Sequence, residues 1–138
     1  MNSPLPDKLS DLIEVALRDL ELVENDKRYT VNMDWWHRSN LYDHTCIVCL
    51  AGAVMAKSLD VSPDRTRFPN DFDDKTEAKL DALNWARVED VDYALYHLDI
   101  KASDYSCLDR EVVCYSDNPE QFKADMREIV AALKEQDL

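Results

Sequence analysis

Cys46-Ile-Val-Cys-Leu-Ala-Gly-Ala-Val-Met-Ala56 is the stretch that decides the fold, because each of its eleven residues is apolar or small. A bilayer span needs about 20 such residues, so this run is too short to cross a membrane. A helix that is apolar on every side belongs in the interior of a packed domain. We therefore predict a central helix over residues 44–59. Glycine is costly inside a helix, which indicates that Gly52 lies where a neighbouring helix approaches closely.

Hydrophobic periodicity predicts further helices before and after this central one. Apolar residues recur at spacings of three and four, which places them on one face of a helix. Polar residues with prolines over 60–72 predict a loop. The predicted segments are an amphipathic helix over residues 6–25, a helix that begins near Asp73 or Asp74, a shorter helix over residues 91–98, and a last helix that Asn118 or Asp117 caps.

Two short segments have the pattern of extended chain. Side chains alternate over residues 29–36, polar residues over 37–43 predict a loop, and residues 111–115 read as a strand that pairs with residues 29–35. The expected fold is mainly α, with α+β as the alternative. It has four or five helices packed around the 44–59 helix and room for a small antiparallel sheet. The length of 138 residues suits one globular domain over residues 1–138.

Composition excludes several classes of function. Lys and Arg number 16 against 29 Asp and Glu, so the net charge of −13 excludes nonspecific nucleic-acid binding and attachment to anionic membranes. The single glycine excludes the glycine-rich loops that hold nucleotide phosphates. The N-terminal MNSPLPDKLSDLIEV has neither the basic start nor the apolar core of a signal peptide, so we expect a cytoplasmic protein.

Four cysteines allow two interpretations. In the first, the cysteines are small hydrophobic core residues, and the protein needs no cofactor. In the second, they form a zinc site or a redox thiol site, and His44 could replace one of the zinc ligands. A Cys–His nucleophile would need His37, His44 or His97, but nothing in the local sequence activates a cysteine, so we expect no enzyme activity. The cysteines are Cys46, Cys49, Cys107 and Cys114.

Charge placement gives the clearest indication of function. Residues 1–69 hold 8 basic and 11 acidic side chains (net −3), whereas residues 70–138 hold 8 basic and 18 acidic ones (net −10). Such a field steers a basic protein surface towards it, although an acidic face can also serve solubility alone. The predicted contact residues at the start of the third helix are Asp71, Asp73, Asp74, Glu77 and Asp81.

Trp35, Trp36 and Arg38 form the densest aromatic group and give a second candidate contact. Trp, Tyr and Arg dominate the energetic centres of protein interfaces. The alternation of the segment predicts that one indole faces the core and the other lies partly outside it.

The segment Tyr29-Thr-Val-Asn-Met-Asp-x-Trp36-His37, followed by the Cys46–Ala56 stretch, resembles a family of small uncharacterised proteins of tailed bacteriophages and prophages. The similarity covers residues 9–59, and the Leu80–Asn84 run shares it. The resemblance implies a phage or prophage origin and supplies no catalytic residues. We therefore predict a non-enzymatic phage accessory protein in the host cytoplasm, whose acidic surface binds a basic host or phage protein. The alternative is a small zinc- or thiol-dependent protein.

Overall fold

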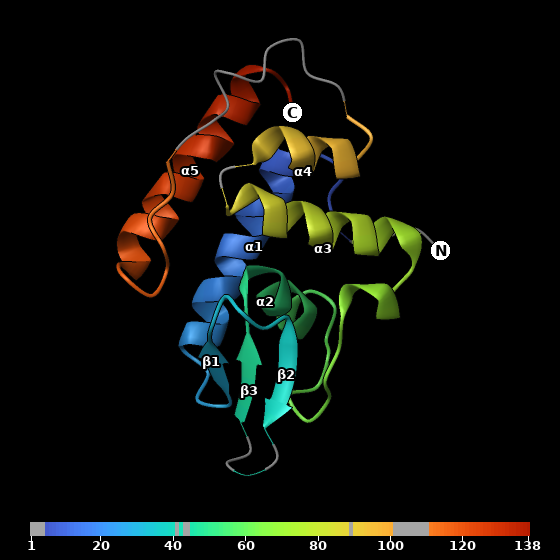
Figure 1. Cartoon of the computed structure of the whole chain (residues 1–138), viewed down its shortest axis with the longest axis vertical. Coiled ribbons are helices and arrows are strands. Elements are labelled where there is room, and N and C mark those ends of the chain that lie inside the picture. The colour runs from blue at the N-terminus through green and yellow to red at the C-terminus, as the bar shows by residue number, and fades with distance from the viewer. Residues whose placement is uncertain (1–4, 41, 43–44, 89, 101–110) are drawn as a thin grey trace.

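The computed structural model describes residues 5–40, 42, 45–88, 90–100 and 111–138, and Figure 1 shows its arrangement. Within these residues the fold is α+β and mainly helical, with a small mixed sheet. The elements, in chain order, are α1 (Leu9–Glu24), β1 (Tyr29–Val31), β2 (His37–Asn40), β3 (Thr45–Val48), α2 (Leu50–Lys57), the short 3-10 helix η1 (Pro69–Asp71), α3 (Asp74–Ala86), α4 (Val91–His97) and α5 (Pro119–Glu135).

The sheet has the strand order β1-β3-β2 and is mixed, so the predicted antiparallel sheet is wrong in type. β1 runs parallel to β3, with Tyr29 opposite Cys46, while β2 runs antiparallel to β3, with His37 opposite Val48. The sequence predicted that residues 111–115 pair with the segment that contains β1. This prediction is wrong, because the partner of β1 is β3. Among the described residues, 111–114 form no strand, because the Val113 N–H donates to the Asp125 carboxylate at 2.9 Å instead.

The predicted helix over 44–59 is wrong in its first part. Thr45–Val48 is β3, and the helix α2 covers only Leu50–Lys57. Thr45, Ile47 and Val48 are β-branched, a shape that favours strands. Cys49 then caps the helix, because its sulfur accepts a hydrogen bond from the Gly52 N–H at 3.3 Å. Val48, Leu50 and Val54 are fully buried, as the apolar run predicted.

Gly52 has a packing role, but its neighbour is not a helix. A Cβ atom at this position would overlap the carbonyl oxygen of Trp36 and lie 2.8 Å from its carbonyl carbon. Trp36 belongs to the connection between β1 and β2, and its carbonyl also accepts a hydrogen bond from the Cys49 N–H at 3.3 Å. The single glycine therefore allows the chain before β2 to lie directly against α2.

The predicted polar loop over 37–43 is wrong for residues 37–40, which form β2. His37 is 1% exposed despite its polar ring. The ring Nδ1 lies 2.8 Å from the carbonyl oxygen of Arg65, so the buried nitrogen has a partner. A long-range hydrogen bond thus lets a polar residue enter the core, which local patterning could not predict.

The other helices confirm the sequence predictions to within a few residues. α1 lies inside the predicted 6–25, and α4 lies inside the predicted 91–98. The Asp73 side chain caps α3 by accepting from the Thr76 N–H at 2.8 Å. Asn118 caps α5 in the same way, with the Gln121 N–H at 3.1 Å. Local periodicity and capping residues were sufficient to locate these helices.

Figure 1 shows how these elements are arranged in space. The sheet forms one end of the molecule, α3 and α4 lie towards the other, and α2 lies between them with contacts to α1, α3, β2 and β3. α5 packs along α1. The α3–α4 pair therefore has one side on the core and one side away from it.

Candidate protein-docking face

α3 has one buried side and an opposite side whose residues are exposed or half-buried. Its buried side contains Leu80, Leu83 and Ala86. Asp74, Glu77 and Asp81 follow one another at spacings of three and four residues, so they lie together on the opposite side. Trp85 continues this row one turn later. The outward side of α3 is therefore acidic in its first half and aromatic at its end.

Two of the five predicted acidic contact residues also have roles in folding. The Asp71 carboxylate accepts from the Phe68 N–H at 2.9 Å and so closes η1. Asp73 is the cap of α3, and its hydrogen bonds with Thr76 lower the pKa of its carboxyl group. Among the described residues, Asp74, Glu77 and Asp81 form no ion pair. Of the five predicted contact residues, only these three take no part in a described helix cap or ion pair.

Asp81 is the carboxylate of this row that is most withdrawn from water. Burial raises its pKa, and the nearby His97 of α4 opposes that rise only in part. A carboxylate that loses hydration without gaining a cation is held in an unfavourable environment. A positive group brought to Asp81 by another molecule would relieve this cost.

An aromatic cluster that the sequence did not reveal lies beside Asp81. The Tyr93 ring is at the centre, with ring centroids 4.5 Å from Trp85, 5.7 Å from Tyr96 and 4.9 Å from His97. Tyr93 is 43% exposed and Tyr96 is 74% exposed. Among the described residues, the His97 Nε2 atom is buried without a hydrogen-bond partner. The spacing 93–96–97 places these rings on one side of α4, but only the turn between α3 and α4 brings Trp85 to them.

We call this surface the α3–α4 face and define it by six residues. The carboxylates come from the first half of α3, and the rings come from its end and from α4. Its members are Asp74, Glu77, Asp81, Trp85, Tyr93 and Tyr96.

The predicted Trp35–Arg38 contact lies beside the end of α3. Trp35 is 41% exposed, and the Arg38 guanidinium carbon lies 4.2 Å from its ring centroid. Trp36 is partly buried against the core, so one indole faces inward and one outward, as predicted. The two indoles line a common hollow of about 280 Å³ with Asn84 of α3 and its C-cap residue Arg87. The Trp35–Arg38 contact therefore lies at the C-terminal end of α3, whereas the predicted acidic contact begins at the N-terminal end of this helix.

The buried cysteines are not activated. Cys46 lies in β3 with its sulfur 3.5 Å from His37 Nδ1, and burial raises the pKa of its thiol to about 12. Burial also lowers the pKa of His37, so the neutral pair is favoured. Cys49 stands at a helix N-terminus, where the dipole favours a thiolate, yet burial raises its pKa. Both thiols behave as core groups.

The zinc alternative loses its expected geometry at Cys46 and Cys49. They do not share a helix face, because one lies in β3 and the other caps α2. Cys114 is exposed, while Cys107 and His44 lie outside the described residues. Within the described part of the chain, no three His, Cys, Asp or Glu side chains are grouped to hold a metal ion.

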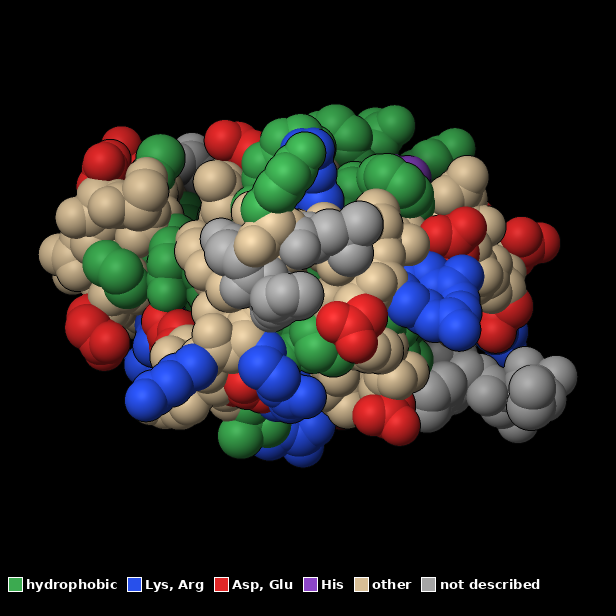
Figure 2. Space-filling model, turned by 90° about the horizontal axis from the view of Figure 1, so that it is seen from below, with side chains coloured by type: hydrophobic (Ala, Val, Ile, Leu, Met, Phe, Trp, Pro, Cys, Tyr) green, Lys and Arg blue, Asp and Glu red, His purple; other side chains and the backbone are tan. Residues whose placement is uncertain are grey.

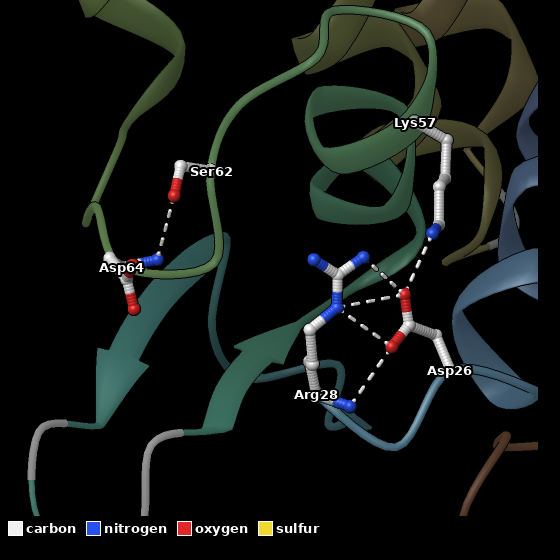
Figure 3. A network of polar contacts seen from close by, with 5 residues as sticks. All are labelled: Asp26, Arg28, Lys57, Ser62 and Asp64. Carbon is white, nitrogen blue, oxygen red and sulfur yellow. Dashed lines mark hydrogen bonds and ion pairs between the residues drawn. The ribbon is translucent and has the colours of Figure 1, made fainter.

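The sheet end of the molecule, formed by β1–β3 and the residues in contact with them, contrasts with the α3–α4 face. Figure 2 shows this end with acidic and basic side chains interspersed. In Figure 3, Asp26 accepts from Arg28 at 2.7 Å and from Lys57 at 3.0 Å, and these contacts lower its pKa. Arg28 and Lys57 also lie 5.7 Å and 5.2 Å from the Tyr29 ring centroid. A carboxylate and a ring are here occupied by cations of the same chain.

Comparisons with known proteins leave the site to be interpreted from its own residues. No protein-family model, curated protein or solved structure matches the chain. Within the described residues, no helix combines the length and the apolar character that crossing a bilayer requires.

Proposed function

We propose that this protein is a non-enzymatic binding module whose α3–α4 face docks on a basic protein surface. The observation that carries the proposal is that one helix pair presents three carboxylates without an ion pair among the described residues and, towards the end of α3, exposed tyrosine rings. The carboxylates are Asp74, Glu77 and Asp81. The capping residues Asp71 and Asp73 lie at the border of this face and add to its negative field.

The two halves of the face contribute differently to binding. Unpaired carboxylates attract a basic surface over a Debye length of roughly 8 Å at physiological salt and so speed association. Tyrosine and tryptophan rings supply apolar contact area that slows dissociation. Trp35, Trp36 and Arg38 flank the face at the end of α3 and extend the contact. No observation favours a zinc or thiol function over this one.

The proposed setting is a bacterial host cell infected by a phage or carrying a prophage. The resemblance of residues 29–56 to a phage and prophage protein family supports this origin, which stays a prediction. The partner is then a host or phage protein in the cytoplasm. A net charge of −13 favours a partner surface that otherwise binds nucleic acid, because such surfaces are basic.

The test is affinity capture from bacterial lysate with the wild-type chain and two charge-matched variants, followed by binding kinetics on each captured protein. The face variant loses three carboxylates by the substitutions Asp74→Asn, Glu77→Gln and Asp81→Asn. Asp73 is retained, because its loss would remove the cap of α3. We expect the face variant to associate about tenfold more slowly with the partner.

The control variant loses the same number of charges from exposed positions outside the face. It carries Asp117→Asn, Glu128→Gln and Glu135→Gln. We expect it to bind as the wild type does, and the difference between the variants should shrink as salt rises. Equal binding by the face variant and the control variant would show that the acidic row only keeps the protein soluble.

A further inference from the structure

Two arginine side chains of this chain lie over aromatic rings. The Arg28 guanidinium pairs with the Asp26 carboxylate at 2.7 Å and lies 5.7 Å from the Tyr29 ring centroid. The Arg38 guanidinium lies 4.2 Å from the ring centroid of Trp35. In both cases the planar group has an aromatic ring within reach, and in the first case a carboxylate as well.

The α3–α4 face has the same two components without the cation. Asp81 lies one helical turn before Trp85, whose ring centroid is 6.4 Å from that of His97, and the His97 ring centroid is 4.9 Å from Tyr93 and 6.1 Å from Tyr96. Among the described residues, no Lys or Arg pairs with Asp81 or lies over either tyrosine ring.

We propose that the centre of the α3–α4 face receives an arginine side chain of the partner, whose guanidinium stacks on Tyr96, the more exposed of the two tyrosine rings, and pairs with Asp81. This inference rests on the proposed function, since it names the group that docks there. The observation behind it is the juxtaposition of a partly desolvated carboxylate with exposed ring faces.

Arginine fits this environment better than lysine for three physical reasons. Its guanidinium is flat, so one face can stack on a ring while its edge donates two N–H groups to a carboxylate. It is also more weakly hydrated than an ammonium group, so moving it beside Asp81 costs less. Lysine can also lie over a ring and pair with a carboxylate, as Lys57 does at Tyr29 and Asp26, but its ammonium group is more strongly hydrated and has no flat edge that donates two parallel N–H groups.

The test uses two peptides of equal length and charge, with arginine or lysine at every basic position, titrated against the full chain by calorimetry. We expect the arginine peptide to bind the wild type about fivefold to tenfold more tightly. The preference should vanish in Asp81→Asn and in Tyr96→Leu, and it should persist in Tyr96→Phe, which keeps the ring. Tyr96 is 74% exposed, so its substitution leaves the fold intact.

The outcomes separate this inference from the proposed function. Equal affinity for the two peptides, lost in the triple face variant and kept in its control, would overturn the arginine inference and leave docking of a basic surface in place. Equal loss of affinity in the face and control variants, or no peptide binding by the wild type, would overturn both. A preference for arginine that survives Asp81→Asn and Tyr96→Leu would place the arginine contact elsewhere and overturn the inference.

Discussion

Asp26 at the sheet end and Asp81 on the α3–α4 face are both partly withdrawn from water, yet the fold treats them in opposite ways. Arg28 and Lys57 surround Asp26, and its pKa falls. No cation of the described chain pairs with Asp81, and burial raises its pKa. The fold uses the charge of Asp26 and leaves that of Asp81 unused. A carboxylate that costs stability without serving the fold is a better candidate for a binding residue than one that is paired.

Other withdrawn charges of the chain behave like Asp26. Lys79 is buried, and its Nζ donates to the Asp7 carboxylate at 3.0 Å and to the Leu5 carbonyl at 2.7 Å. Lys123 is buried as well, and its Nζ lies 2.6 Å from the Glu24 carboxylate. Asp19 is an exception, because it is 1% exposed and burial raises its pKa as it does that of Asp81. Its carboxylate nevertheless accepts from the Ser58 hydroxyl and lies 3.4 Å from Arg18. Among the described residues, Asp81 forms no ion pair, which distinguishes it from these buried ions.

The largest expected effect concerns the sheet end, at Gly52. Gly52→Ala would place a Cβ atom on the Trp36 carbonyl, so the chain before β2 must move away from α2. We expect a loss of about 3 kcal/mol or more in the free energy of unfolding, measured by urea denaturation. Ala53→Gly is the matched control, with an expected loss of about 1 kcal/mol. A Gly52→Ala variant as stable as this control would contradict the described packing.

The next effect is alkaline destabilisation through Cys46. Burial raises the pKa of its thiol from 9.0 to about 12, so the unfolded chain releases this proton first. The contribution of Cys46 is therefore complete below pH 9.0 and is lost as the pH rises towards 12. We expect Cys46→Ala to flatten the alkaline decline in stability. Cys114→Ala should leave that decline unchanged, because Cys114 is exposed.

Removing the charge of Asp26 should have a smaller effect. Its pKa is lowered, so its contribution is complete above the ordinary value of 3.8 and is lost as the pH falls below it. Asp26→Asn should cost about 1 to 2 kcal/mol at neutral pH, and the difference from wild type should narrow in acid. Asp64→Asn serves as the control, because no ion pair joins its carboxylate to Arg28 or Lys57 in Figure 3. If Asp26→Asn and Asp64→Asn were equally stable, the charge of Asp26 would not stabilise the fold, and Asp26 would not differ from Asp81 in this respect.

The smallest effect, and the one with the opposite sign, is expected at Asp81. Because its pKa is raised, the wild type gains stability as the pH falls through that pKa, and an asparagine cannot gain it. At neutral pH, Asp81→Asn should leave the melting temperature equal or slightly higher, with a change in unfolding free energy within about 0.5 kcal/mol. A clear loss of stability would show that Asp81 has a structural role and would weaken its assignment to docking.

The helices were predictable because their signals are local. Apolar spacing located α1 and α5, and the side chains of Asp73 and Asn118 close the first turns that the sequence assigned to them. The junction between β3 and α2 was not predictable in the same way. A short run that is apolar throughout has no periodicity to separate a buried strand from a buried helix.

In the candidate site, too, the part that depends on local spacing was predicted and the part that depends on packing between helices was not. Its acidic row follows from residue spacing on one helix and was predicted, except that Asp71 and Asp73 also cap helices. The cluster of Trp85 with Tyr93 was missed, because its rings belong to two helices and meet only after the turn between them.

The sequence by itself determined the charge, the absence of glycine-rich nucleotide loops, the positions of four helices and the burial of the Cys46–Ala56 stretch. These properties depend on composition and on residues within a few positions of one another. Tertiary structure decided that His37 is buried, that Lys57 joins the local partner Arg28 at Asp26, and that Asp81 is left beside exposed rings. Each of these depends on which distant segment supplies a partner, and that choice is made only when the elements pack together.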